Sequence, residues 1–324
     1  MIFQLIFIIA SATIKNVAGC EGVPDHCPKD RVNFRLYTNH YQSNQSYHPF
    51  DLEDKNTISK ATFDPNAPVK FILHGYTGGA GNELMQKLIH EYLESPTPIN
   101  VVMVNYDKIA REGCYPRLFW NAGALGKCGA EMILQIIKNK GVSIEKFHII
   151  GFSIGAHIAA EISNHLRTKF LRLERITGLD PAFMFFFPLV ISSKHKLNKQ
   201  HAKFVDVIHT NIFWYGIPYS MAHYDFYANG GRIQPDCEKE RDTYRCYHKM
   251  AVEYFINTIN NKAEYKATKI ACPLWRWFLG YCPKNSPIHA NVGEHAFRPT
   301  NLEEGAYYFD TRRDIKSSYQ ENKQ

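Results

Sequence analysis

Short apolar runs alternate along most of this chain with longer segments in which apolar residues recur at helical spacing. The runs that predict strands are residues 33–38, 69–76, 101–106, 147–150, 173–181 and 204–210. The segments that predict helices are 84–93 with Asn82 as the cap, 120–137, 158–166 and 250–259. Strands that alternate with helices indicate the α/β class, with a mostly parallel sheet covered by helices on both faces.

Three candidate groups follow apolar runs of this predicted sheet. Ser153 lies just beyond such a run, and Tyr76 and Asp180 lie at the C-terminal ends of theirs. Ligands of parallel α/β sheets bind at the carboxyl ends of the strands. We therefore expect these groups to share one rim of the sheet.

Ser153 stands in Gly-Phe-Ser-Ile-Gly, between an apolar strand and a segment of helical period. The five-residue pattern is weak by itself, but a strand before it and a helix after it are the context of a nucleophile elbow. Gly151 and Gly155 remove the side-chain bulk that would keep strand and helix apart. The sequence therefore predicts a catalytic serine; a buried serine in a glycine-rich turn is the alternative.

A serine hydroxyl needs a neighbouring base that is itself held by a carboxylate. Asp180 follows an apolar strand and precedes Pro181, so it is the best candidate for the acid; a turn or N-cap aspartate is the alternative. Three downstream histidines could be the base: His209, His223 and His248. The pattern favours His248, in a loop at the start of a helix, but leaves the other two open.

The oxyanion that forms during acyl transfer needs two aimed N–H donors. One is expected from Ile154, the residue after the serine. The other should come from the turn after an earlier strand, where we select Tyr76 and keep Thr77 as an alternative.

The composition of the chain indicates the compartment in which the protein is expected to act. The first ten residues, Met1 to Ala10, are largely apolar and small residues follow, so residues 1–19 are predicted to be a signal peptide cleaved after Ala12 or Gly19. The chain contains eight cysteines and no C-x-x-C pair, which favours disulfides of a secreted protein over a metal site. Asn44 begins the only glycosylation sequon. The 324 residues carry a net charge of +7, but the basic residues are scattered, and nothing resembles a nucleic-acid-binding module.

Several motifs together resemble the pancreatic-type lipase family of α/β-hydrolases. The matching segments, in the order of the family, are residues 74–76, 151–155, 176–182, 205–210, 225–231, 234–237 and 246–248. The resemblance assigns Ser153, Asp180 and His248 as nucleophile, acid and base, and Tyr76 and Ile154 as oxyanion donors. It also implies a single catalytic domain over residues 20–324, without the C-terminal β-sandwich of the family.

Within that family the chain is most similar to the wasp-venom-type phospholipase A1 and related insect lipases. Only eight residues, almost all charged, separate Cys237 from Cys246, where large-lid lipases have a long amphipathic segment. The resemblance therefore implies a phospholipase A1 that acts by an acyl-enzyme on the sn-1 ester of phospholipids, as a secreted monomer in peripheral contact with a membrane. A triacylglycerol or galactolipid lipase is the alternative, and an inactive lipid-binding or yolk-type protein is a further one.

The resemblance also supplies disulfide pairs and expected absences. It supports Cys237–Cys246 and Cys272–Cys282, suggests Cys27–Cys114, and leaves Cys20 and Cys128 unassigned. No cofactor is expected, and no calcium, because residues 192–201 contain no carboxylate. Two apolar segments, 183–187 and 273–281, are predicted to be either lipid-contacting surfaces or packed core.

Overall fold

The computed structural model describes residues 19–39, 47–186, 192–282, 286–299 and 302–312. The strands are β1 (Asn33–Tyr37), β2 (His48–Phe50), β3 (Val69–Leu73), β4 (Asn100–Asn105), β5 (Phe147–Phe152), β6 (Leu173–Leu179), β7 (Ala202–His209), β8 (Tyr224–Ala228), β9 (Lys266–Lys269), β10 (His289–Asn291) and β11 (Gly305–Phe309). The helices are α2 (Lys55–Lys60), α3 (Glu83–Leu93), α4 (Tyr115–Lys140), α5 (Ile154–Arg167), α6 (Thr243–Ile259) and α7 (Leu274–Phe278). Short 3₁₀ turns are η2 (Ile144–Lys146), η3 (Ser193–His195), η4 (Pro235–Cys237) and η5 (Gly293–His295).

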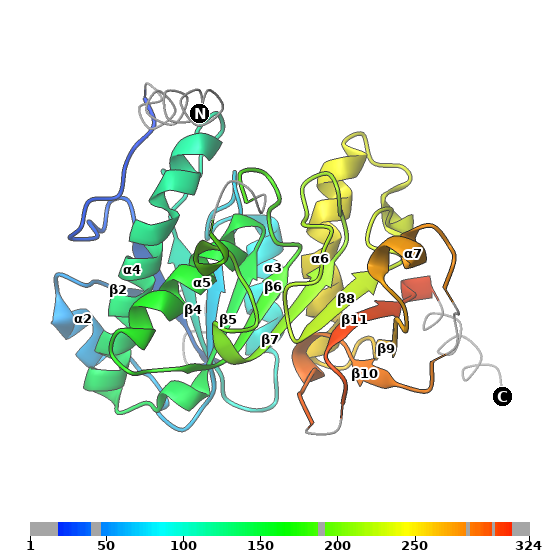
Figure 1. The fold of residues 1–324 in the computed structure, drawn as a ribbon. Coiled ribbons are helices and arrows are strands. Elements are labelled where there is room, and N and C mark those ends of the chain that lie inside the picture. The colour runs from blue at the N-terminus through cyan, green and yellow to red at the C-terminus, as the bar shows by residue number, and fades with distance from the viewer. Residues whose placement is uncertain (1–18, 40–46, 187–191, 283–285, 300–301, 313–324) are drawn as a thin grey trace.

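Within the described ranges the strands form one sheet in the order β10-β9-β11-β8-β7-β6-β5-β3-β4-β1-β2 (Figure 1). The seven strands from β11 to β4 run parallel to their neighbours. The outer strands β1, β2, β9 and β10 pair antiparallel. The predicted mostly parallel α/β-hydrolase sheet is confirmed.

Two apolar layers enclose this sheet. Alternate residues of one strand enter different layers: Phe71 and Leu73 contribute to the core beneath α4 and α5, whereas Ile72 contributes to the core beneath α3 and α6. Every residue of β3 is buried, as expected of a strand that is covered on both faces. Helices α3 and α6 therefore cover one face of the sheet, and α4 and α5 cover the other.

Helix α6 begins earlier than its apolar period predicts. It starts at Thr243 because the Asp242 side chain accepts the Arg245 N–H at 3.0 Å and caps the helix. His248 therefore lies in the second turn of a helix and not in a preceding loop.

The disulfide prediction for the first half of the chain is wrong. Cys20 pairs with Cys114 and Cys27 with Cys128, so Cys27–Cys114 does not form and neither remaining cysteine is free. Both bonds attach the N-terminal segment to α4 or to the residue that precedes it, and Cys128 is a buried residue of α4. The local pairs Cys237–Cys246 and Cys272–Cys282 are present.

Some predictions fall outside the described part of the chain. These are the glycosylation site at Asn44 and residues 1–18 of the predicted signal peptide. Among the helices that the structure describes, none has the length and apolarity needed to cross a bilayer.

Candidate active site

Ser153 stands on the sharp turn between β5 and α5. Its φ of 57° and ψ of −122° are strained for a residue with a side chain. The turn is held because the Ser153 N–H donates to the Leu179 carbonyl at 2.9 Å. A Cβ on Gly155 would lie 2.6 Å from the Leu73 carbonyl oxygen, and one on Gly151 would lie 2.5 Å from the Gly155 carbonyl. Strand and helix can therefore pass this closely only with glycine at both positions.

Asp180 lies directly after β6, next to Ser153 at the carboxyl rim. Phe152 and Leu179, the residues that precede the two groups, are paired in neighbouring strands. The Asp180 carboxylate is fully buried, and its Oδ1 accepts the N–H groups of Thr210 at 2.8 Å and Asn211 at 3.1 Å. These bonds fix the carboxylate and leave Oδ2 for one further donor.

That donor is His248. Its Nδ1 lies 2.5 Å from Asp180 Oδ2, across 68 residues of sequence. Because Nδ1 donates to the carboxylate, the neutral ring presents Nε2 as a proton acceptor. The His248 side chain is 12% exposed and its ring lies beside Phe152, with centroids 4.7 Å apart. The structure thus brings together the predicted acid and base beside the strained serine.

The other two candidate histidines have structural partners. His209 is fully buried, bonds to Asp225 Oδ1 at 2.9 Å through Nε2 and contacts the Ile217 carbonyl at 3.0 Å through Nδ1. His223 Nδ1 accepts the Val205 N–H at 2.9 Å. Neither ring contacts Asp180, whereas His248 does.

The turn after β3 presents the candidate oxyanion donor. Within the described residues the Tyr76 N–H has no acceptor, whereas the Thr77 N–H donates to the Ala110 carbonyl at 2.7 Å. The alternative donor is therefore already occupied. Ile154 is the first residue of α5, so its N–H has no partner within the helix.

His74 shapes this turn from below. Its Nε2 accepts the Tyr106 N–H at 3.1 Å, so Nδ1 carries the proton and donates to the Gly75 carbonyl at 2.8 Å. Burial lowers the pKa of His74 to about 4, and the ring is therefore neutral near pH 7. The sequence motif contained His74, but nothing in its pattern indicated this supporting role.

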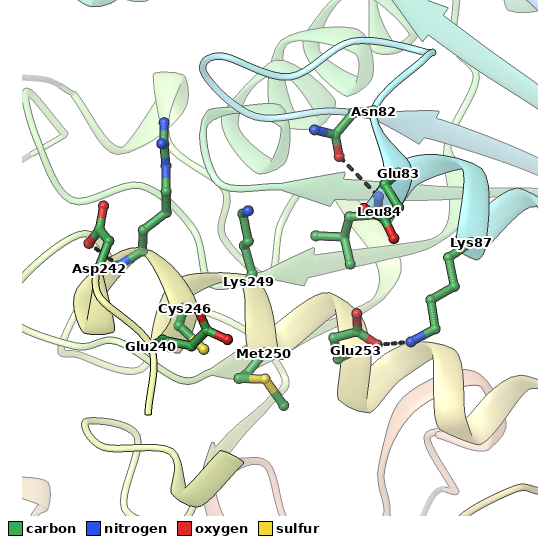
Figure 2. Close-up of a pocket in the computed structure, with 11 residues that line it drawn as sticks. Asn82, Glu83, Leu84, Lys87, Glu240, Asp242, Cys246, Lys249, Met250 and Glu253 are labelled. Carbon is green, nitrogen blue, oxygen red and sulfur yellow. Dashed lines mark hydrogen bonds and ion pairs between the residues drawn. The ribbon is translucent and has the colours of Figure 1, made fainter. Parts of the chain in front are cut away.

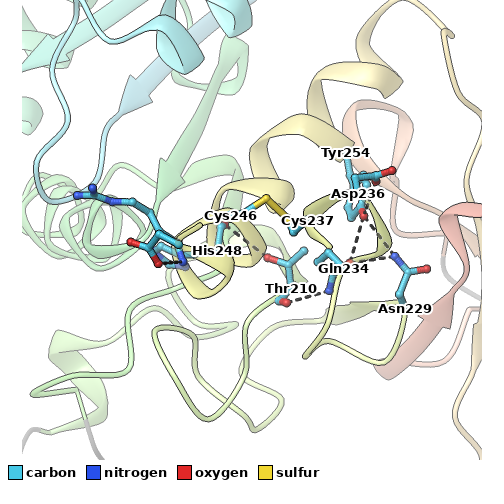
Figure 3. Close-up of a disulfide and its surroundings, with 10 residues drawn as sticks. Thr210, Asn229, Gln234, Asp236, Cys237, Cys246, His248 and Tyr254 are labelled. Atoms are coloured by element: carbon cyan, nitrogen blue, oxygen red, sulfur yellow. Dashed lines mark hydrogen bonds between the residues drawn. A yellow bond between two sulfur atoms is a disulfide. The ribbon is translucent and has the colours of Figure 1, made fainter. Parts of the chain in front are cut away.

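The loop closed by Cys237–Cys246 lies beside His248 (Figure 3). Its base is anchored by buried Gln234, whose Nε2 donates to the Thr210 carbonyl at 2.8 Å and to the Ala228 carbonyl at 3.1 Å. Figure 3 shows Gln234 between Thr210 and Asn229. The disulfide and the anchored Gln234 therefore fix both ends of the eight-residue loop between Cys237 and Cys246.

Exposed aromatic side chains lie near the candidate base. Phe213, Trp214 and Tyr215, in the loop after β7, and Tyr244 of α6 are each more than 40% exposed; we call these four residues the aromatic ridge. Trp214 packs on Tyr244 with ring centroids 4.2 Å apart, and Tyr215 lies 5.5 Å from the His248 ring. The ridge is therefore continuous with the candidate site.

The two apolar segments left open by the sequence divide between core and surface. In the first, Phe186 is buried and stacks on His157, whereas Met184 is 53% exposed. In the second, Trp277 and Phe278 pack against Tyr227, whereas Trp275, Leu279 and Tyr281 are 59%, 62% and 74% exposed. Each segment thus has a packed part and an exposed part.

Comparison with known proteins bears on this site. The sequence profile of the family described as Lipase matches residues 12–287. The chain belongs to the Lipase family. It is 30% identical to pancreatic lipase-related protein 2 of Cavia porcellus over 74% of this chain and 54% of that protein. It is 31% identical to pancreatic triacylglycerol lipase of Sus scrofa over 72% of this chain and 55% of that protein.

The family also includes members described as inactive. The chain is 28% identical to inactive pancreatic lipase-related protein 1 of Mus musculus, over 87% of this chain and 63% of that protein. The chain spans between about half and three fifths of the length of these relatives. Family membership establishes the fold but does not by itself decide activity.

Sequence reasoning missed one residue that the site requires. A Cβ on Gly216 would lie 2.4 Å from Asp180 Oδ1, so the carboxylate can keep its place only beside a glycine. Gly216 lies 36 positions beyond Asp180 in a segment without a recognisable motif. No signal in a single sequence could have connected the two.

Proposed function

We propose that this chain is a secreted serine hydrolase of lipid carboxylic esters, with phospholipase A1 activity. The observation that carries the proposal is Ser153 on a strained elbow beside the Asp180–His248 pair, with two N–H groups available next to it. Four disulfides in the described residues support an extracellular location. An inactive lipid-binding protein would not need this arrangement.

The proposed reaction proceeds in two halves. Ser153 Oγ attacks the ester carbonyl while His248 Nε2 takes its proton, and Asp180 stabilises the charged ring. The N–H groups of Tyr76 and Ile154 stabilise the oxyanion. The intermediate expels the glycerol oxygen, which receives the proton from His248 and leaves as a lysophospholipid. Water, deprotonated by His248, then releases the fatty acid from Ser153.

The choice of phospholipid rests on the loop closed by Cys237–Cys246. Residues 238–242 of this loop are all charged and all exposed. A segment of this composition cannot form an apolar cover, and water remains in contact with the rim. A headgroup can therefore stay hydrated while its ester reaches Ser153.

The aromatic ridge provides a surface for contact with lipid. Large exposed aromatics next to a catalytic site are suited to the interface between water and acyl chains. Trp214→Ser should reduce co-sedimentation with phosphatidylcholine vesicles without a change in the hydrolysis of a soluble p-nitrophenyl ester. Equal co-sedimentation of the variant and the wild type would remove this role from the ridge.

The deciding experiment uses a phosphatidylcholine with different acyl chains at sn-1 and sn-2. The expected product is the sn-1 fatty acid, and Ser153→Ala should lose at least about 10³-fold in kcat while it retains the melting temperature of the wild type. Release of the sn-2 chain, or full activity of the variant, would refute the proposal.

A triacylglycerol lipase is the second candidate, because one of the relatives is a pancreatic triacylglycerol lipase. The chemistry at Ser153 would be the same. Faster hydrolysis of emulsified triolein than of phosphatidylcholine would favour this candidate. The same comparison with a galactolipid tests the third lipid class.

A further inference from the structure

A charged cavity of about 430 Å³ lies between the start of α3 and the first half of α6 (Figure 2). Its lining includes Asn82, Glu83 and Lys87 from the α3 side and Glu240, Arg245, Lys249 and Glu253 from the α6 side. Its volume is in the range of sites that hold small ligands. None of the proposed steps of catalysis uses it.

The cavity adjoins the candidate oxyanion turn. The guanidinium of Arg245 donates to Thr77 Oγ1 at 3.0 Å, and Thr77 follows Tyr76 directly. Lys249 is the neighbour of His248, and Figure 2 shows its side chain rising from α6 into the space that faces Asn82 and Glu83. A molecule whose ester is at Ser153 could therefore extend into this cavity.

The charges of the lining are only partly matched to one another. Lys87 pairs with Glu253, and Asp242 is occupied as the cap of α6. Among the described residues, the side chains of Lys249, Glu83 and Glu240 have no ion-pair partner, and Arg245 bonds to a neutral hydroxyl. Two cations and two carboxylates therefore remain available to a ligand.

These two cations and two carboxylates determine which class of ligand fits the cavity. A phosphodiester is recognised by arginine and lysine, and an alkylammonium by carboxylates. A ligand with only negative charge would be repelled by Glu83 and Glu240, and an uncharged glyceride would form no ion pair with any of the four exposed groups. A zwitterionic headgroup satisfies both sets.

We propose that this cavity binds the headgroup of a zwitterionic glycerophospholipid, with its phosphate at Arg245 and Lys249 and its ammonium at Glu83 and Glu240. The site rests on the proposed function, because it names the substrate class of the same catalytic centre. Arg245, next to the oxyanion turn, is placed for the phosphate, which lies closer to the sn-1 ester than the ammonium does.

The test compares two substrates in the same detergent micelles: phosphatidylcholine and the diacylglycerol with identical acyl chains. The Arg245→Gln/Lys249→Gln variant should lose about 10- to 100-fold in kcat/KM for phosphatidylcholine and retain its rate on diacylglycerol. The control, Lys138→Gln/Lys169→Gln, removes two exposed charges outside both the cavity and the charged loop and should change neither rate. Equal loss on both substrates would show that Arg245 acts only through the turn, and unchanged phosphatidylcholine hydrolysis would exclude the cavity; both results overturn the proposal.

A second variant tests the carboxylates independently. Glu83→Gln/Glu240→Gln should lower the rate on phosphatidylcholine and raise the rate on phosphatidylglycerol, so the ratio of the two rates should fall at least 10-fold. An unchanged ratio would overturn the assignment of the ammonium. A wild-type protein that hydrolyses triolein but not phosphatidylcholine would refute the proposed function itself, a result distinct from either failure of the variants.

Discussion

Asp180 is the residue on which the geometry of the candidate site depends most. It adopts a φ of 43°, which is strained for an aspartate, and its carboxylate receives hydrogen bonds from Thr210, Asn211 and His248. Because the group is buried, its position is set by these donors and by the absence of a side chain at Gly216. A change that alters none of the three proposed catalytic side chains can therefore disable the site.

Gly216→Ala should lower kcat/KM by roughly 10²- to 10⁴-fold, because the new methyl group displaces the carboxylate that orients His248. Hydrolysis of a soluble ester, measured together with the melting temperature, checks this. Gly123→Ala is the matched control: a Cβ there meets nothing within 4 Å, and it should leave activity unchanged. Full activity of Gly216→Ala would mean that the position of Asp180 is not limiting.

At the scale of elements, the sequence predicted the central strands and the elbow better than the connections. An apolar run that is buried on both faces is recognisable without a partner, as β3 and β4 show. Strand β9, Lys-Ala-Thr-Lys, is short and polar because it pairs near the edge of the sheet, so its pattern resembles a loop. The pairing of Cys20, Cys27, Cys114 and Cys128 depends on approach in space, which spacing does not encode.

The corrected disulfides have a measurable consequence. Cys27–Cys128 closes a loop with a sequence separation of 101 residues, and the loss of such a cross-link costs about 4–5 kcal/mol of stability in the chain-entropy estimate. The Cys27→Ser/Cys128→Ser variant should unfold at lower denaturant concentration and keep the Cys20–Cys114 bond. Peptide mapping of the unreduced wild-type protein would reveal a Cys27–Cys114 peptide if the present pairing were wrong.

A buried ionic cluster attaches η5 to the strands at positions away from the carboxyl rim. Lys70 of β3 contacts Glu294, and Arg175 of β6 bonds to both oxygens of Asp206 at 2.9 and 3.0 Å and to the Gly293 and Glu294 carbonyls. Burial alone would raise the pKa of Glu294, but Lys70 and Arg175 outweigh it and lower that pKa. The carboxylate is therefore ionised and compensates a buried ammonium.

Glu294→Gln should consequently reduce the free energy of unfolding by about 3–5 kcal/mol, because Lys70 remains buried without its carboxylate. Chemical denaturation at pH 7 measures this. Glu145→Gln is the surface control, since Glu145 pairs with Lys203 and is 65% exposed; little change is expected there. Equal stability of the two variants would contradict the role of the cluster.

At the scale of the whole molecule, the two ends of the parallel strands carry different groups: the candidate site lies at one end and the buried ionic cluster at the other. The carboxyl ends carry Ser153 and Asp180, and residues nearer the amino ends carry Lys70 and His148 of the ionic cluster. The rim that carries the candidate site could be predicted from sequence because each group follows an apolar run. The cluster could not, because Lys70 and His148 are polar residues within apolar strands whose partners come from distant segments.

Buried neutral histidines make the stability of the whole fold dependent on pH. Burial lowers the pKa of His74 to about 4 and that of His157 to about 3, and it lowers the pKa of His148 well below its usual value. In the unfolded chain each ring has a pKa near 6.5, so the unfolded state binds more protons below that pH. The stability that these neutral rings contribute is therefore fully present above about pH 6.5, and it is lost as the pH falls through the folded pKa values of about 4 for His74 and about 3 for His157.

At pH 5 these three rings should together bind about three protons when the protein unfolds. This corresponds to a slope of about 4 kcal/mol in the free energy of unfolding per pH unit. Urea titrations at pH 7.5, 6 and 5 measure the slope. His157→Gln should reduce it by about one third, whatever its effect on stability at pH 7.5, because one proton-binding group of the unfolded state is removed. A free energy of unfolding that stays constant from pH 7.5 to 5 would show that these rings are protonated in the folded protein, which conflicts with the bonds that His74 Nε2 and His157 Nδ1 accept from backbone N–H groups.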